Sequence, residues 1–244
     1  MALRESYSKN PITEALIDIQ VDPILSVPPQ SLESIHEKIS GSFPEKKTRQ
    51  TLEAMWDIKN QAPPKHQVSI NGYQFWSADK TEVFQARIDG FSCSRLKPYI
   101  KWETHFPKMM DNWALYRDQF KPINIKRIAV RYINVFEVPG AQFELKDYFN
   151  STPEPPASLP QRLENFLSRL VIQKDDHCKA IITFTIRRPT SPDFTPVLLD
   201  IDVSKVVSFP AEYQGLTNEF ELLHTFAEEI FEAYVTDRTR GLIR

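Results

Sequence analysis

Several stretches of the chain alternate apolar and polar residues with a period of two, and this pattern constrains the fold more than any other feature. Within residues 14–21, one side carries Ala15, Ile17, Ile19 and Val21, and the other carries Glu14, Leu16, Asp18 and Gln20. Successive side chains of a strand point to opposite faces, so this stretch predicts a β-strand with one buried face. Residues 125–136, 180–188 and 197–203 divide in the same way.

The first half of the chain adds a short helix, further strands and a long helix. We expect a helix from Ser31 to the residue before Gly41, and strands over 48–59, 66–79, 81–88 and 91–97. The pairs Asn71-Gly72 and Asp89-Gly90 indicate hairpin turns or bulges. An aromatic stripe from Trp102 to Phe120 has helical spacing, and Pro107 either begins or kinks that helix.

The second half repeats this order of elements without repeating the residues. A strand over 125–139 precedes a short helical turn at "ELKDYF" and a proline-rich surface loop, "NSTPEPPASLPQ". The next stretch, "RLENFLSRLVIQK", has a helical start and a strand-like end. Two more strands precede a final helix, in which Asn218 and Glu221 are predicted to form a capping pair.

The order strand, helix, several strands, helix therefore occurs twice, over residues 1–122 and 123–244. We predict two tandem units fused into one globular α+β domain, because the strands are connected as hairpins rather than by helical crossovers. Two architectures fit this order. The antiparallel strands could form one curved sheet, an open saddle with its helices packed on one face, or they could close into a tunnel.

Arginine recurs on the polar side of the predicted strands. With a two-residue turn at Asp89-Gly90, Arg87 would lie opposite Ser92 and away from the apolar face. The alternation places Arg127, Arg131 and Arg187 on the corresponding side of their strands. A guanidinium group suits carboxylates and phosphates and tolerates partial burial. The face could be solvated or paired internally, or it could be a concave surface that holds an anion, a peptide or a protein segment.

Carboxylates on the same side give an alternative interpretation. Asp200 and Asp202 are two residues apart on one strand, and Glu14 and Asp18 occupy the first strand. Together they could bind Mg²⁺ or Mn²⁺ for a metal-dependent phosphohydrolase with a tunnel-like active site. Asp-x-Asp is a weak motif, and pairing with the arginines is its commoner use. If these carboxylates do not bind a metal ion, no cofactor is expected.

Composition excludes several classes of function. The net charge of −2 gives no overall attraction to nucleic acid, and six glycines leave no G-x-G-x-x-G or Walker-type phosphate loop. Two cysteines do not form a disulfide framework, and no signal peptide or membrane-spanning stretch is recognisable, so we expect a cytoplasmic protein. Its expected partner is an unknown protein or a small anionic ligand, and a homodimer is compatible with the sequence.

Four phrases of the chain, in this order, resemble a known family: "NPITEALIDIQV", "GFSCSRLKPYIKWE", "RIAVRYIN" and "VLLDIDV…LLHTFAEEIFEAYVTD". It is a sporadically distributed, functionally uncharacterised family of bacterial and archaeal proteins of about this length. The resemblance implies a cytoplasmic prokaryotic protein, an accessory of a defence or mobile locus, and supplies no catalytic residues.

The doubled units also resemble, in architecture alone, triphosphate-tunnel phosphatases and TATA-binding-protein-like saddles. The tunnel enzymes open with alternating glutamates and a lysine, whereas the first strand here carries Glu14, Leu16, Asp18 and Gln20. The sequence therefore favours a non-catalytic binding protein, and acidic residues among the arginines disfavour nucleic acid as the ligand.

Overall fold

A computed structural model describes residues 7–24, 27–55, 65–160, 163–189 and 191–244. Within these residues the chain folds as α+β, with one antiparallel sheet of nine strands and five α-helices. The elements of the first half are β1 (Ile12–Val21), the 3-10 helix η1 (Pro29–Ile35), α1 (His36–Ile39), β2 (Glu45–Met55), β3 (Lys65–Trp76), β4 (Glu82–Arg87), β5 (Gly90–Leu96) and α2 (Trp102–Phe120). Those of the second half are β6 (Asn124–Pro139), α3 (Leu145–Tyr148), β7 (Leu167–Gln173), β8 (Cys178–Ile186), β9 (Phe194–Pro210), α4 (Leu216–Tyr234) and α5 (Asp237–Ile243).

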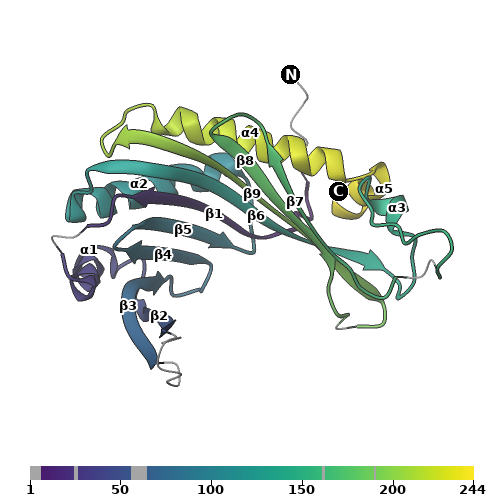
Figure 1. Cartoon of the computed structure of the whole chain (residues 1–244), viewed down its shortest axis with the longest axis horizontal. Helices are drawn as coiled ribbons and strands as arrows, with labels where there is room; N and C mark the ends of the chain where they lie inside the picture. The colour runs from purple at the N-terminus through teal and green to yellow at the C-terminus, as the bar shows by residue number, and fades with distance from the viewer. Residues whose placement is uncertain (1–6, 25–26, 56–64, 161–162, 190) are drawn as a thin grey trace.

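The strands follow the order β2-β3-β4-β5-β1-β6-β9-β8-β7, so β1 and β6 lie side by side in the middle. Beyond β1 the first half continues outward through β5, β4, β3 and β2. Beyond β6 the second half continues through β9, β8 and β7. Figure 1 shows an arched and twisted sheet, in which β2 and β3 bend downward at one end and α4 runs along the upper side. In the described residues the sheet does not close, which makes the predicted tunnel-like closure wrong and leaves the open form.

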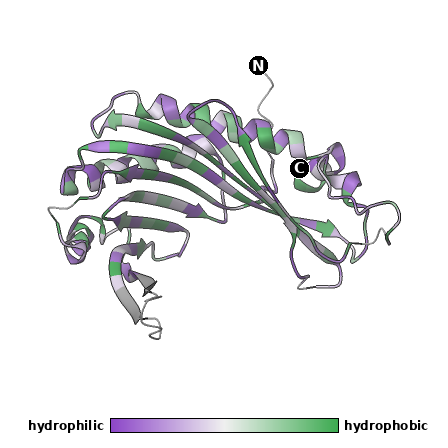
Figure 2. Ribbon diagram, viewed as in Figure 1, coloured by the Kyte–Doolittle hydropathy of each residue, from purple (hydrophilic) through white to green (hydrophobic). Residues whose placement is uncertain are grey.

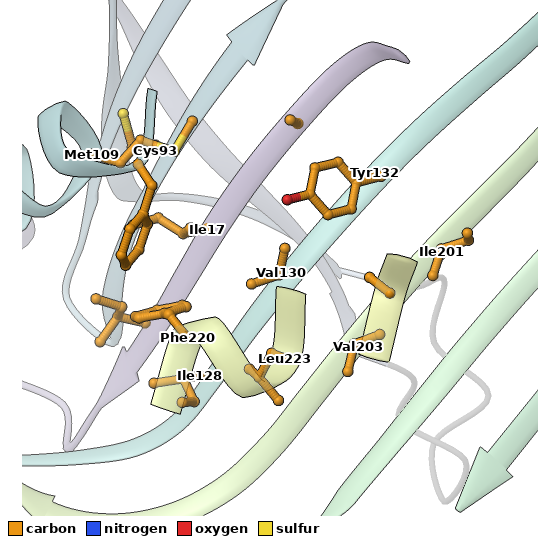
Figure 3. Packing of buried hydrophobic residues seen from close by; sticks show 14 of the residues in the cluster. Ile17, Cys93, Met109, Ile128, Val130, Tyr132, Ile201, Val203, Phe220 and Leu223 are labelled. Carbon is orange, nitrogen blue, oxygen red and sulfur yellow. The ribbon is translucent and has the colours of Figure 1, made fainter. Parts of the chain in front are cut away.

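The predicted alternation of apolar and polar residues determines which side chains of the strands form the core. Directly paired residues share a face in antiparallel strands, and Ile17 pairs with Cys93 and Val130, which in turn pairs with Val203. All four are buried. Hydrophobic and hydrophilic residues alternate along the central strands in Figure 2. The close-up in Figure 3 shows side chains of β1, β6 and β9 gathered with Phe220 and Leu223 of α4.

Aromatic side chains connect the two long helices to the sheet. The Phe91 ring of β5 contacts Trp113 and Tyr116 of α2, with centroids 6.0 and 5.8 Å apart. On β6, Phe136 stacks on Phe231 of α4. The helix over 102–120 is confirmed, and Pro107 lies inside it rather than at its start. The aromatic stripe of that helix therefore belongs to the core.

The tight turn between β4 and β5 differs from its predicted register. Arg87 pairs with Gly90 rather than with Ser92, so the two linking residues are Ile88 and Asp89. The shift is two residues, and a two-residue shift keeps every side chain on its predicted face. Gly90 has a φ of 155°, and a Cβ atom there would lie 2.3 Å from the carbonyl oxygen of Ile19. Glycine is required there because two backbones approach closely.

Other predicted turns and boundaries had mixed outcomes. Of the two predictions for Asn71-Gly72, the bulge is confirmed, because the pair lies inside β3 where the register with β2 shifts. The strand-like end of the ambiguous stretch after the proline-rich loop is β7 (Leu167–Gln173), and the helical start is wrong over residues 163–166. The final helix begins at Leu216 after Gly215, with no side-chain cap, so the predicted capping by Asn218 is wrong. Positions 56–59 of the predicted strand 48–59 lie outside the described residues. In the part of the chain that is described, no helix combines the length and apolar character needed to cross a bilayer.

Candidate functional site

The second face of the sheet carries charged side chains from four strands, which we call the arginine–aspartate face. It is defined by Asp18 (β1), Arg87 (β4), Arg127 and Arg131 (β6), and Asp200 and Asp202 (β9). The register explains their proximity. Gln20 of β1 lies opposite Gly90 on one side and opposite Arg127 on the other, and Arg131 lies opposite Asp202. The sheet thus brings together residues that are up to 184 positions apart in the chain (202 − 18).

Arg87 anchors this face. Its Nη2 donates to Asp18 Oδ2 at 2.8 Å, and its Nε donates to Asp89 Oδ1 at 3.1 Å. Strand β5 separates β4 from β1, so the side chain has to cross β5 to reach Asp18. Gly90 provides the space that the Arg87 side chain needs for this crossing, because a Cβ atom at position 90 would lie 2.9 Å from Arg87 Nη2. Burial alone would lower the pKa of Arg87, but the charges of Asp18 and Asp89 outweigh it and raise that pKa.

Arg127 joins the two halves of the sheet electrostatically. Its Nη1 donates to Asp18 Oδ1 at 3.3 Å, and its Nη2 lies 3.6 Å from Asp202 Oδ1. Asp18 therefore lies between two guanidinium groups, one from strand β4 of the first half and one from the central strand β6. Positive and negative side chains alternate along this row, and the charges largely cancel.

Arg131 and Asp200 form the tightest pair of the face. Arg131 donates from Nε to Asp200 Oδ1 at 2.8 Å and from Nη2 to Oδ2 at 2.6 Å, the two-pronged geometry that suits a carboxylate. The hydrogen bonds that Arg131 donates to Asp200, together with the charges of Asp200, Asp202 and Glu14, outweigh the effect of burial and raise the pKa of Arg131. The side chain of Arg131 is still 40% exposed, so this pair is accessible from outside.

Asp202 is the least satisfied carboxylate of the face. Its Oδ1 is buried and accepts no hydrogen bond from the described residues. Burial raises the pKa of Asp202, and the positive charges of Arg127 and Arg131 only partly oppose that rise. The neighbouring Asp200 and Asp18 charges raise it further. Asp202 is thus held near guanidinium groups without a close pairing of its own.

The structure brings together three of the four predicted arginines and leaves out the fourth. Arg187 follows the last residue of β8, its side chain is exposed, and within the described ranges it forms no ion pair. Its backbone N–H donates to the carbonyl of Pro196. Sequence reasoning also missed Asp89 and Gly90 as parts of this site, because it treated both only as turn residues.

The four carboxylates of the alternative interpretation occupy the same face, but they are not arranged as a metal site. Asp18, Asp200 and Asp202 each face a guanidinium group, and Glu14 lies on β1 at the end near Arg131. Across the described residues, no group of three or more His, Cys, Asp or Glu side chains has an arrangement that could hold a metal ion. Binding of Mg²⁺ or Mn²⁺ here would require the arginines to release their carboxylates.

A second polar cluster lies inside the core. His224 of α4 is buried and stacks on the Trp102 ring, with the ring centroids 4.4 Å apart. Its Nδ1 shares a 2.8 Å hydrogen bond with the Tyr132 hydroxyl, and its Nε2 lies 3.2 Å from Glu228 Oε1. This cluster joins α2, α4 and β6, so its role is packing.

Comparison with known proteins adds no further assignment. No protein-family model matches the chain, and the search of curated proteins found no match.

Proposed function

We propose that this chain is a non-catalytic binding protein and that its arginine–aspartate face holds a segment of another protein. The observation that carries the proposal is the alternation of guanidinium and carboxylate groups over four strands, from Arg87 through Asp18 and Arg127 to Asp202. A surface of both signs can pair with both signs on a partner. Such patterns favour specificity for a protein surface over attraction to one kind of ion.

A small anionic ligand has less support than a protein segment. Arg87, Arg127 and Arg131 already face carboxylates, and a phosphate or carboxylate ligand would have to displace one of them. Arg187 is free of such pairing within the described ranges, but it lies away from the face. Nucleic acid is disfavoured for the same reason, since the interleaved aspartates repel a phosphate backbone.

We also propose that the chain consists of two related units whose helices cover one side of the sheet and leave the other side open. The pairing order supports this, because β5, β4 and β3 flank β1 as β9, β8 and β7 flank β6. Contacts of α2 with Phe91 and of α4 with Phe136 support it too, since both residues belong to the buried face. The arginine–aspartate face would then be the open side of a saddle.

The alternative, a Mg²⁺- or Mn²⁺-dependent phosphohydrolase, has weaker support. Its carboxylates face guanidinium groups, and over the described residues the sheet is open and has no tunnel wall to enclose a triphosphate. Incubation of the protein with nucleoside triphosphates and polyphosphate in the presence of either metal is the direct assay. Phosphate release that Asp200→Ala abolishes would favour the enzyme.

Affinity capture from a lysate of the native host tests the binding proposal. The bait is the wild-type chain, the variant Arg127→Ala/Arg131→Ala, or the control Arg187→Ala, each checked for an unchanged circular dichroism spectrum. We expect a discrete protein that the wild type and the control retain and the double variant loses. Calorimetry with that purified protein should then show at least a tenfold weaker affinity for the double variant. Equal affinity for all three chains would contradict the proposal.

A further inference from the structure

Strand β7 exposes apolar residues at one edge of the sheet. Four of its seven residues are large and aliphatic, and their exposed fractions are 74% (Leu167), 42% (Leu170), 62% (Val171) and 41% (Ile172). Leu170 and Ile172 lie on the buried-face side, opposite Ile182 and Ala180, whereas Val171 lies on the other side, opposite Ile181. The edge therefore offers apolar surface on both faces of the sheet. In the described residues β8 is its only neighbouring strand.

The opposite edge of the same sheet is built differently. The first six residues of β2 read "EKKTRQ", and Glu45, Lys46 and Lys47 are exposed along them. Charged residues on an edge strand discourage pairing with another chain. The sequence of β7, "LSRLVIQ", has one charge, no proline and no bulge against β8. The β2 edge is thus protected by charge over residues 45–50, whereas the β7 edge is suited to pairing.

The fold also leaves an open position beside β7. In the first half, β2 flanks β3, but in the second half no described strand flanks β7 on its outer side. The segment between α3 and β7 carries Pro153, Pro155, Pro156 and Pro160. Proline has no backbone N–H to donate, so this segment is unsuited to fill the position.

We propose that β7 pairs antiparallel with β7 of a second copy of this chain, in a register centred on Leu170. This register pairs all seven residues. Leu170 meets Leu170, Arg169 meets Val171, Ser168 meets Ile172 and Leu167 meets Gln173 of the second copy. The result is a two-fold symmetric dimer with one continuous sheet, in which the exposed apolar side chains on each face gain a neighbour from the second copy.

Charge and symmetry favour a second copy as the occupant. Antiparallel pairing of identical edges is self-complementary, and the second copy brings a strand of the same length. A register centred on Arg169 would place two guanidinium groups directly opposite each other, whereas the Leu170 register places each opposite a valine. One strand per copy buries less than the roughly 800 Å² per partner of a standard interface. We therefore expect a dimer that dissociates at micromolar concentrations.

Sedimentation velocity on the full chain, from low to high micromolar concentration, tests this proposal. Val171→Lys puts an ammonium group opposite Arg169 of the second copy, and Val171→Glu puts a carboxylate there. The matched control, Thr48→Lys, adds the same charge to the exposed position of the β2 edge. We expect the wild type and the control to dimerise alike, the lysine variant to dimerise at least tenfold more weakly, and the glutamate variant to dimerise at least as well as the wild type.

Oxidative cross-linking gives an independent measurement of the register. Leu170→Cys should form a disulfide-linked dimer in the folded protein, whereas Gln173→Cys should not, because position 173 faces position 167. A protein that stays monomeric at every concentration would overturn the proposal, as would a dimer that Val171→Lys leaves intact. Equal loss of dimer in the lysine and glutamate variants would overturn the Leu170 register.

Discussion

Replacing Asp18 by asparagine removes the carboxylate that Arg87 and Arg127 share. The side chain of Arg87 is 9% exposed and that of Asp18 is 18% exposed, so water replaces the lost charge poorly. Removing one partner of a buried pair costs about 3–5 kcal/mol. Arg87 keeps its bonds to Asp89 and Ser92, and asparagine still offers an acceptor oxygen, so we expect a smaller loss of about 2–3 kcal/mol. That loss would lower the melting temperature by roughly 5–10 °C.

Urea denaturation followed by circular dichroism measures this loss. The matched control is Asp147→Asn, which breaks an exposed pair with Arg238 and should cost less than about 0.5 kcal/mol. A double-mutant cycle with Arg87→Met isolates the pairing, and in that background Asp18→Asn should cost about 1 kcal/mol or less. If the two substitutions are additive, or if Asp18→Asn costs no more than the control, Asp18 does not hold Arg87 as the geometry indicates.

Three further predictions concern single residues. Because burial raises the pKa of Asp202, its ionised form opposes folding, so Asp202→Asn should raise the free energy of unfolding at pH 7. The gain should shrink as the pH falls through the raised pKa of the folded protein and vanish below the ordinary aspartate pKa of about 4; a variant less stable than wild type at pH 7 in urea titrations would contradict this. Burial raises the pKa of Cys93 to about 12 and also raises that of Cys178, so neither thiol should react with Ellman's reagent at pH 8 until the protein unfolds; rapid reaction of the folded chain would contradict it. Gly90→Ala should lower the melting temperature far more than Gly41→Ala, since a Cβ atom meets backbone at the first position and open space at the second; equal shifts would show that the close approach is absent.

Much of the buried face could be predicted from the sequence, because alternation is a local property. Ala15, Ile17 and Ile19 are buried as expected, and an error of two residues in the β4–β5 turn left every face unchanged. The open form of the sheet could not be separated from a tunnel. Closure requires the two outermost strands to meet with the right tilt and stagger, and local alternation in the sequence does not specify either quantity.

The candidate site was predictable only as a set of residues. Arginines on the polar side were identified correctly for Arg87, Arg127 and Arg131, but their partners depend on strand order. Asp18 meets Arg87 because β5 alone separates β1 from β4 and carries a glycine at the crossing. Arg187 does not join the cluster because its backbone pairs with Pro196 of β9, four residues along that strand from Asp200 (200 − 196).

The most direct test of the proposal that the arginine–aspartate face binds a partner is to exchange the two residues of one of its ion pairs. The variant Arg131→Asp/Asp200→Arg keeps an ion pair between β6 and β9 but reverses its direction. Calorimetry would measure its affinity for the protein that the wild-type chain retains from its host lysate. A docking face predicts near wild-type stability and at least a tenfold loss of affinity, about 1.4 kcal/mol. Unchanged affinity in a stable variant would mean that the paired charges only support the sheet.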